Sequence, residues 1–308
     1  MNCPRNSMPS YILLTVDVED WFQVENLKSC VPLSSWDKQE LRVERNTHRL
    51  LDLFDSGLPG ATRANTQHKK ISATFFVLGW IAQRLPHLVK EIHARGHEVA
   101  SHGYSHTLCT NSPSEELKND LARSKEYLED ILGTAIYGYR APSFSANDTI
   151  MRIIRDCGYR YDSSFNSFNI NKRYGKISLC CDQRQGVAYK LYDDFYELPV
   201  SNLKLGKYVF PWSGGGYFRV IPIRIFNKGV RTILKRDGAY IFYMHPWEID
   251  HEQPRLKSLP LNLRTRHYIN LKSTSHKLKV FLRSFAECSF LTCTEYLNKI
   301  DVPGKGGQ

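Results

Sequence analysis

Short apolar runs of strand length alternate with segments of helical period along most of this chain, and this alternation limits its fold more than any other feature. Residues 11–16, 72–77 and 239–244 are runs of this kind and indicate buried strands. Such alternation predicts βα units and a mostly parallel sheet, the α/β class. Helices are expected over 42–54, 81–95, 115–132, 148–157 and 223–236, and further strands at Val99, 136–139, 159–161 and 197–200.

The chain has 308 residues and no linker rich in Pro, Gly or Ser that would divide it. We therefore expect one domain over residues 1–250, followed by a helical C-terminal extension over residues 251–308 that packs on it. Residues 59–70 are polar, basic and without a hydrophobic pattern, which indicates a surface insertion between a helix and a strand.

The formal net charge of +11 comes from Lys and Arg residues that are dispersed along the chain, and no nucleic-acid motif accompanies them. We expect a solvated basic surface that suits an acidic polysaccharide or the inner membrane surface, and no nucleic-acid partner. No apolar run is long enough to span a bilayer, and the N-terminus lacks the apolar stretch of a signal peptide. Together with eight cysteines that show no disulfide pattern, this predicts a cytoplasmic location.

Acidic side chains stand at the end of the first strand, where parallel α/β proteins usually carry their active sites. Asp17 and Glu19 are two residues apart, so on a strand they point the same way. Asp20 points away unless the strand has already bent. One carboxylate could bind a metal while its neighbour acts as general base. The alternative is a solvated acidic strand end or a helix cap.

Two histidines follow the strand at Val99. His102 and His106 are four residues apart and project to one side of a helical turn, or of the loop that starts one. Neutral imidazole is a common ligand of zinc and similar ions, and a catalytic metal usually has three protein ligands and one position for water. A carboxylate must then come from elsewhere, and Glu19 or Asp20 could supply it. The alternative is a polar loop with two histidines.

Other strand ends carry polar residues as well. Arg140 follows residues 136–139, Asp162 follows residues 159–161, and His245 ends the buried run 239–244. If the sheet closes, these side chains converge with the carboxylates and histidines at one mouth. Three glycines at 214–216 would let backbone approach a substrate closely, although three glycines are also an ordinary flexible loop.

In this order the residues resemble the five motifs of the polysaccharide deacetylases of carbohydrate esterase family four, the NodB-like domain. The matching segments are 15–20, 101–106, 140–142, 161–164 and 244–245, and the resemblance covers roughly residues 11–247. Residues 16–24, 73–80, 214–219 and 245–248, with the C-terminal part from about 267 to 297, look like the deacetylase branch of bacterial exopolysaccharide loci (PEP-CTERM/exosortase-associated). The resemblance implies a deformed (β/α) barrel that is partly or fully closed.

The resemblance also implies roles for these residues. Asp17 aligns as the base, Arg140 orients it, and Asp162 tunes the general acid His245. His102 and His106 would hold a divalent metal with Glu19 or Asp20, because the family's adjacent Asp-Asp is spread here over Asp-Val-Glu-Asp; strand geometry favours Glu19. Zinc is the expected ion, with cobalt, nickel or iron as alternatives. Substrate contacts are expected from backbone near Tyr104 or Ser143, from Gly215, and from Trp212, Tyr217 and Trp247, whose rings could equally be packing.

These roles predict metal-assisted hydrolysis of N-acetyl groups on the amino sugars of a bacterial exopolysaccharide or its precursor. The basic surface leaves room for a peripheral contact with the inner membrane or with polysaccharide assembly proteins. Two rivals stay open. One is an amidohydrolase of the allantoinase or imidase kind that acts on a small cyclic amide. The other is a non-catalytic glycan-binding scaffold.

Overall fold

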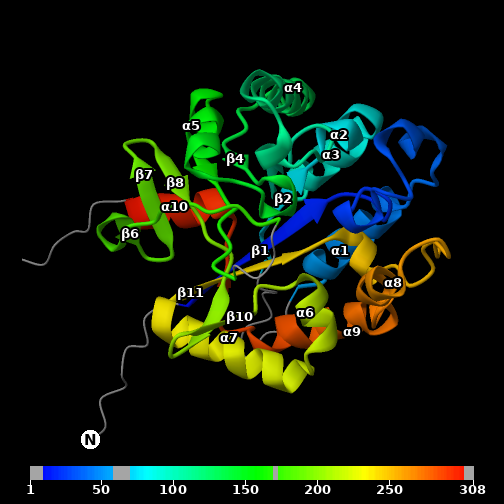
Figure 1. The fold of residues 1–308 in the computed structure, drawn as a ribbon. Coiled ribbons are helices and arrows are strands. Elements are labelled where there is room, and N and C mark those ends of the chain that lie inside the picture. The colour runs from blue at the N-terminus through cyan, green and yellow to red at the C-terminus, as the bar shows by residue number, and fades with distance from the viewer. Residues whose placement is uncertain (1–9, 58–69, 169–172, 302–308) are drawn as a thin grey trace, which may run out of the picture.

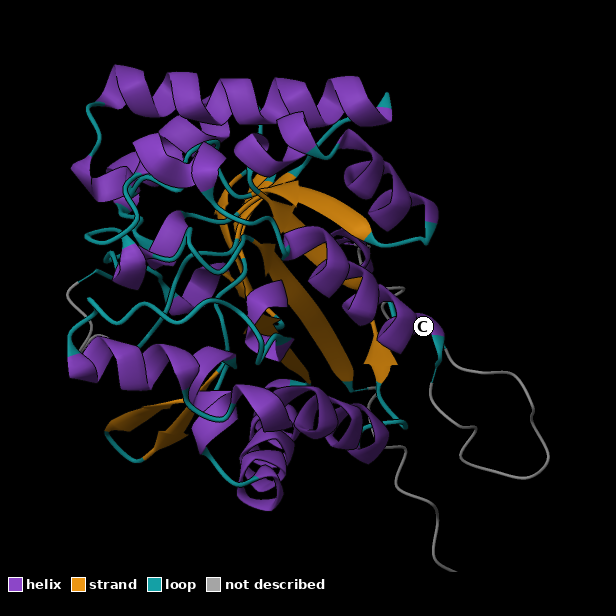
Figure 2. Cartoon of the chain, turned by 90° about the vertical axis from the view of Figure 1, so that its right-hand side faces the viewer, coloured by secondary structure: helices purple, strands orange, loops and turns teal. Residues whose placement is uncertain are grey.

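The structure is a computed structural model that describes residues 10–57, 70–168 and 173–301. A curved sheet with helices around it forms the centre of the molecule (Figure 2). Its strands run in the order β11-β1-β2-β3-β4-β5-β8-β7-β6, and neighbours from β11 to β8 are parallel, which confirms the α/β prediction. The parallel strands are β1 (Tyr11–Val18), β2 (Ala73–Val77), β3 (Glu98–Ser101), β4 (Gly138–Tyr139), β5 (Tyr161–Asp162), β8 (Phe195–Glu197) and β11 (Ala239–Met244).

Five further strands lie where the sequence analysis expects none. Two of them, β7 (Ala188–Tyr192) and β6 (Arg184–Gln185), extend the sheet beyond β8 in the antiparallel sense. A separate antiparallel ribbon consists of β9 (Asn202–Leu205) and β10 (Tyr208–Pro211). The last, β12 (Ser289–Phe290), comes from the C-terminal extension and pairs with the start of β1.

The expected helices are present, with one difference. Residues 81–95 form two helices, because Pro86 has no N–H to continue the first one and suits the opening position of the second. The helices are α1 (Val43–Asp55), α2 (Gly79–Arg84), α3 (Pro86–Ala94), α4 (Ser114–Leu132), α5 (Asp148–Asp156), α6 (Gly215–Val220), α7 (Ile223–Asp237), α8 (Leu261–Tyr268), α9 (Leu271–Ser284) and α10 (Cys293–Asp301).

Residues on β1 alternate between two hydrophobic clusters. Ile12 and Leu14 pack in the larger cluster, which includes the apolar faces of the helices, whereas Leu13 packs with Phe76 and Ile241 in a smaller one. Ser201, just beyond β8, donates its N–H to Ile241 O at 3.4 Å and accepts from Ile241 N at 2.9 Å. Ser201 thus connects the end of β8 with β11, and Ser213 accepts the N–H of Tyr243 at 2.8 Å on the same edge of β11. The sheet is an open path of strands, which agrees with the partly closed form of the expected barrel.

The C-terminal extension contacts the rest of the molecule at two separate places. In Figure 1, α8 and α9 lie near α6, whereas α10 lies beside β7 and β8, where Tyr296 Oη accepts the N–H of Val187 at 3.0 Å. Of the predicted insertion at 59–70, residues 59–69 lie outside the described part of the chain. Across the described ranges, no helix has both the length and the apolar character that crossing a bilayer requires.

Candidate active site

A pocket opens at the carboxyl ends of the parallel strands, with an empty volume of about 790 Å³ that includes its open mouth. The strand periodicity of two brings Asp17 there, because it follows Leu13 and Thr15 on the inner face of β1. Most of the predicted site residues meet at this pocket. Its lining includes Asp17, Glu19, His102, His106, Ser143, Gly215, His245 and Trp247.

Arg140 lies directly behind the pocket and holds Asp17. One guanidinium nitrogen, Nη1, donates to Asp17 Oδ1 and to Thr15 Oγ1, at 2.7 Å in each case. The other nitrogens donate to the carbonyl and hydroxyl oxygens of Ser163, at 2.9 and 2.8 Å. The guanidinium is completely buried and leaves Asp17 Oδ2 toward the pocket, where a base must point. This arrangement can orient a carboxylate for proton transfer.

Asp162 lies on the Arg140 side of the pocket, and its hydrogen bonds go to Ser164 and Glu197 rather than to His245. Its carboxylate accepts from Ser164 N at 2.7 Å and from Ser164 Oγ at 2.8 Å, which orders the turn that presents Ser163 to Arg140. Burial raises the pKa of Asp162, whose carboxyl is also hydrogen-bonded with that of Glu197. The structure therefore does not bear out the expected contact of Asp162 with His245: Asp162 is bonded to Ser164, in the segment that holds Arg140.

Glu19, His102 and His106 form a buried group that could hold a metal ion. One donor atom from each lies within 4.8 Å of the others. The loop after β3 brings the histidines together without a helical turn, with Gly103 and His106 both at positive φ, +74° and +52°. A non-glycine residue in this region is strained, and such strain is concentrated at functional sites.

The chemistry of these donors suits a divalent cation. His102 Nδ1 lies 2.8 Å from the carbonyl oxygen of Arg140, so Nδ1 donates and Nε2 is left to bind a metal, a common support for a ligating imidazole. Burial lowers the pKa of His102 to about 4, which keeps the ring neutral. Burial alone would raise the pKa of Glu19, but the charges of His106 and His245 outweigh it and lower this pKa to about 2. The two imidazoles and one carboxylate fit a zinc-like ion.

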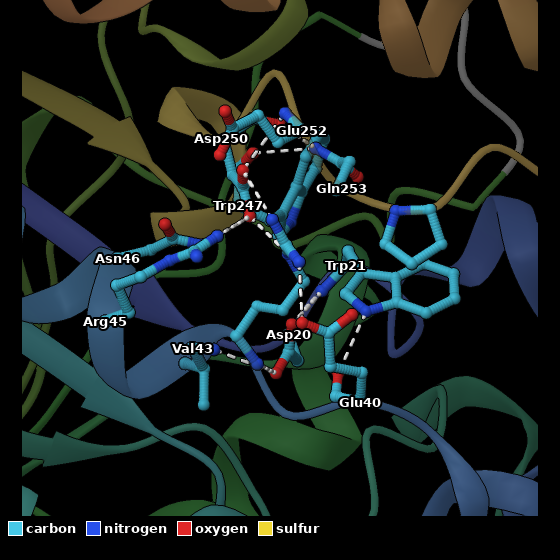
Figure 3. A network of polar contacts seen from close by, with 12 residues as sticks. Asp20, Trp21, Glu40, Val43, Arg45, Asn46, Trp247, Asp250, Glu252 and Gln253 are labelled. Carbon is cyan, nitrogen blue, oxygen red and sulfur yellow. Dashed lines mark hydrogen bonds and ion pairs between the residues drawn. The ribbon is translucent and has the colours of Figure 1, made fainter.

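Asp20, the alternative carboxylate ligand, points away from this group. Its Oδ2 accepts the backbone N–H groups of Arg42 and Val43, at 2.6 and 2.8 Å, where α1 begins (Figure 3). The orphan N–H groups at the start of a helix need such an acceptor. Burial raises the pKa of Asp20 to about 6. Of the two candidates, only Glu19 lies beside the histidines.

The same network contains a buried ion pair behind Trp247. Asp250 accepts from Arg42 Nε at 2.6 Å and from Asn46 Nδ2 at 3.1 Å, while Gln253 ties the Trp247 carbonyl to the same turn at 2.9 Å (Figure 3). Burial opposes ionisation of Asp250, but the hydrogen bond and charge of Arg42 lower its pKa from 3.8 to about 2.

We expect the ion pair of Asp250 to make stability depend on acid pH. Because its pKa is lower in the folded state, its contribution of about 2 kcal/mol is complete above about pH 4 and is lost as the pH falls toward about 2. Urea unfolding of the wild type and of Asp250→Asn measures this. The difference in unfolding free energy should be largest near neutral pH and shrink below about pH 4. A difference that stays constant over this range would contradict the assignment.

His245 stands across the pocket from the histidine pair. Its Nε2 lies 3.2 Å from Glu19 Oε1 and 3.9 Å from Asp17 Oδ2, and its Nδ1 lies 2.7 Å from Glu248 Oε1. Burial would lower the pKa of His245, but Glu19 and Glu248 raise it to about 9. A protonated imidazole in this position could donate a proton to a leaving group. Glu248 was given no role by sequence reasoning; its spacing of three residues from His245 is the one clue.

Of the residues predicted to contact substrate through their backbone, Ser143 and Gly215 lie at the pocket and Tyr104 does not. Ser143 lines the pocket with φ +52°, and Gly215 lines it with φ +54°, where a Cβ would come within 2.7 Å of Tyr243 Oη. Tyr104 does not reach the pocket. Its N–H donates to Asp120 Oδ2 at 2.8 Å, and its ring packs under the guanidinium of Arg123 at 3.6 Å. Ser143 is therefore the candidate that could donate to an oxyanion.

The three aromatic rings proposed to stack on sugars have other partners. Trp212 stacks on Phe226 at 5.8 Å and donates Nε1 to the Phe226 carbonyl, as part of the packing against α7. Tyr217 makes an edge contact with Phe168 at 6.0 Å and is not among the lining residues. Trp247 does line the pocket, but its ring stacks on the ring of His245 at 5.2 Å and on that of His267 at 4.4 Å, measured between ring centroids. Its buried ring shapes the wall and is not an open platform for a sugar.

Two family models match this chain. Residues 45–161 match the model described as "Polysaccharide deacetylase", and residues 163–298 match "Domain of unknown function (DUF3473)". A peptidoglycan-N-acetylglucosamine deacetylase of Bacillus cereus is 34% identical over 91 residues, which cover 30% of this chain and 42% of the relative. The chain spans about half or less of the length of the first curated relatives it matches.

Solved structures share the fold at low sequence identity. A Mycobacterium smegmatis protein assigned as a polysaccharide deacetylase is similar with a TM-score of 0.61 and 19% identity, over 97% of this chain and 92% of that one. Puue allantoinase is similar with a TM-score of 0.56 and 12% identity, over 94% and 89%. Both neighbours agree with the barrel fold, and the fold alone does not distinguish their chemistries.

Proposed function

We propose that this chain, which carries a polysaccharide deacetylase domain, is a metal-dependent hydrolase that removes N-acetyl groups from the amino sugars of a polysaccharide. The observation that carries the proposal is that three kinds of chemical group lie together in one pocket. An oriented carboxylate, a buried ligand group for a cation and a pocket-facing histidine all lie there, and no other group of three His, Cys, Asp or Glu side chains suited to a metal is found in residues 10–57, 70–168 and 173–301.

In the proposed reaction Asp17 is the base. Arg140 holds its Oδ1, and the free Oδ2 takes a proton from the attacking water. Glu19, His102 and His106 would hold a divalent metal, which when bound polarises the acetyl carbonyl and lowers the pKa of water. The Ser143 N–H would donate to the oxygen that becomes negative as the carbonyl carbon turns tetrahedral.

His245 is the proposed acid. It gives the proton on Nε2 to the amine nitrogen as the C–N bond breaks, so acetate and a free amino group leave the site. His245 Nε2 and Asp17 Oδ2 are 3.9 Å apart and both face the pocket, so one acetamido group bound there can meet both side chains.

For the glycan, we propose a bacterial exopolysaccharide or its cytoplasmic precursor. The support is the sequence at 214–219 and 245–248, which is typical of the branch described above, and the basic character of the chain. Relatives named as peptidoglycan deacetylases make peptidoglycan fragments the necessary comparison substrate. Zinc is the proposed ion, because two imidazoles and a carboxylate are its usual catalytic ligands.

Acetate release from a panel of acetylated glycans tests the proposal. The panel contains chitooligosaccharides, peptidoglycan fragments and an N-acetylated exopolysaccharide, each assayed as purified, after chelation and after zinc is restored. We expect release that disappears with the chelator and returns with zinc. Turnover of allantoin or a cyclic imide without acetate release would favour the cyclic-amide reaction instead. Glycan binding without any turnover would leave only a binding role and contradict the proposed enzyme.

A further inference from the structure

We infer that the region of unknown function, residues 163–298, completes the active site: Arg219 and Glu248 are positioning residues that hold His245 in its working orientation. The inference rests on the proposed function, because it assumes that His245 is the acid. The acid, its carboxylate partner and the arginine behind it all belong to this region, whereas Arg140 and the ligand histidines belong to the segment that matches the deacetylase model.

Glu248 is the direct partner of His245. It lies in the 3-10 turn Pro246–Ile249 that follows β11, so its carboxylate folds back onto the histidine. Its Oε1 lies 2.7 Å from His245 Nδ1 and 3.2 Å from the backbone N of the same residue. A carboxylate can only accept here, so the proton of the neutral ring stays on Nδ1 and Nε2 is the atom that exchanges protons with the pocket.

Arg219 holds the second oxygen of Glu248. Its Nε donates to Glu248 Oε2 at 2.8 Å, and both side chains are almost completely buried. A buried carboxylate without a counter-charge would be costly, so the arginine keeps Glu248 ionised and fixed in one rotamer. Arg219 is on α6, whose first two residues, Gly215 and Gly216, line the pocket.

The remaining nitrogens of Arg219 bind the C-terminal extension. Nη1 donates to the carbonyl oxygens of His267 and Ile269, at 2.7 and 2.9 Å, and Nη2 donates to that of Arg266 at 3.1 Å. These carbonyls are at the C-terminal end of α8, where a helix has oxygens without internal partners and favours a cation. The same end of α8 brings His267 onto Trp247, whose Nε1 is 3.4 Å from Glu19 Oε1. The extension therefore braces both His245 and Glu19.

A purely structural role for Arg219, as a cap of α8, is the competing explanation, and the chain offers a matched control. Arg231 on α7 caps the end of α9 in a similar way, with Nη2 2.8 Å from the Ser284 carbonyl and Nη1 3.2 Å from Glu287, but on the surface and away from the pocket. The variants are Glu248→Gln, Arg219→Met, Arg219→Lys and the control Arg231→Lys, each in the full chain loaded with zinc.

The positioning role predicts a loss in kcat that stability does not explain. For acetate release from chitooligosaccharide, we expect Glu248→Gln and Arg219→Met to lower kcat about 100-fold, with KM within about threefold. Arg219→Lys should restore part of the loss, because the charge on Glu248 is again balanced, and Arg231→Lys should keep kcat within about twofold. Zinc content and melting temperature are measured for every variant. Equal kcat losses in all four variants, or losses that follow melting temperature, would overturn the role.

A second readout separates this inference from the proposed function. Nitrogen-15 spectra of labelled histidine rings report which nitrogen of His245 carries the proton, with His245→Gln for assignment. We expect Nδ1 of His245 to carry a proton in the wild type, because it faces Glu248, and we expect altered ring signals in Glu248→Gln. If the wild type releases no acetate from any glycan, but the His245 ring signals change in Glu248→Gln, the proposed deacetylase function is overturned and the positioning of His245 by Glu248 stands. Active wild type with unchanged ring signals and kcat in the variants would overturn the positioning alone.

Discussion

Replacing His102 by alanine should remove both the bound metal and the hydrolytic activity, with a loss in kcat/KM of at least about 10³-fold. His102 is one of the three candidate protein ligands and its ring is held by the Arg140 carbonyl, so its loss leaves two ligands from that group. Metal content by elemental analysis and acetate release, measured on the same preparation, check this result. Adding excess zinc should restore little activity.

The control for this variant is His93→Ala, which removes an exposed histidine from α3. It should keep metal content and kcat/KM within about twofold of the wild type. Because the alanine at 102 could also weaken the fold, His106→Ala and Glu19→Gln are measured beside it with their melting temperatures. Full metal occupancy in a folded His102→Ala protein would show that the ligand assignment is wrong.

Replacing Asp17 by asparagine should lower kcat by roughly 10²- to 10⁴-fold and leave the metal in place. The amide keeps the size of the carboxylate but cannot take a proton from water. Asp17 is not one of the three candidate ligands, so elemental analysis should find wild-type zinc content. The ion pair with the completely buried Arg140 is also lost, so the melting temperature should fall, and kcat is best measured well below it.

Asp20→Asn is the matched control for Asp17→Asn. Asp20 lies three residues along the chain and caps α1, away from the pocket. Its variant should lose stability and keep kcat within about threefold. A large loss of zinc in Asp17→Asn, or equal losses of kcat in both variants, would mean that the two carboxylates do not have the separate roles proposed here.

Much of the site was predictable because parallel strands end at one edge of a sheet. Apolar segments of the sequence predicted β1, β3, β4 and β11. The polar residue after each of these strands reaches the same edge of the sheet, because the strands are parallel, and this does not depend on the helices between them. The spacing of Asp17 and Glu19 gave their shared direction, since both line the pocket. The short antiparallel strands β6 and β9 were not predictable, because two to four residues carry too little periodicity.

The sequence alone determined the order of βα units and which polar residues stand at strand ends, because both depend on local hydrophobic period. Only the tertiary structure decided which partner each polar residue meets. Asp20 turns to the start of α1, Asp162 bonds to Ser164, and Glu248 reaches His245. Buried charges and N–H groups must find partners, and those partners come from turns and helix ends whose positions are set by packing across the whole sheet. For that reason the strand-end residues were foreseen, while the support of Glu248 by Arg219 was not.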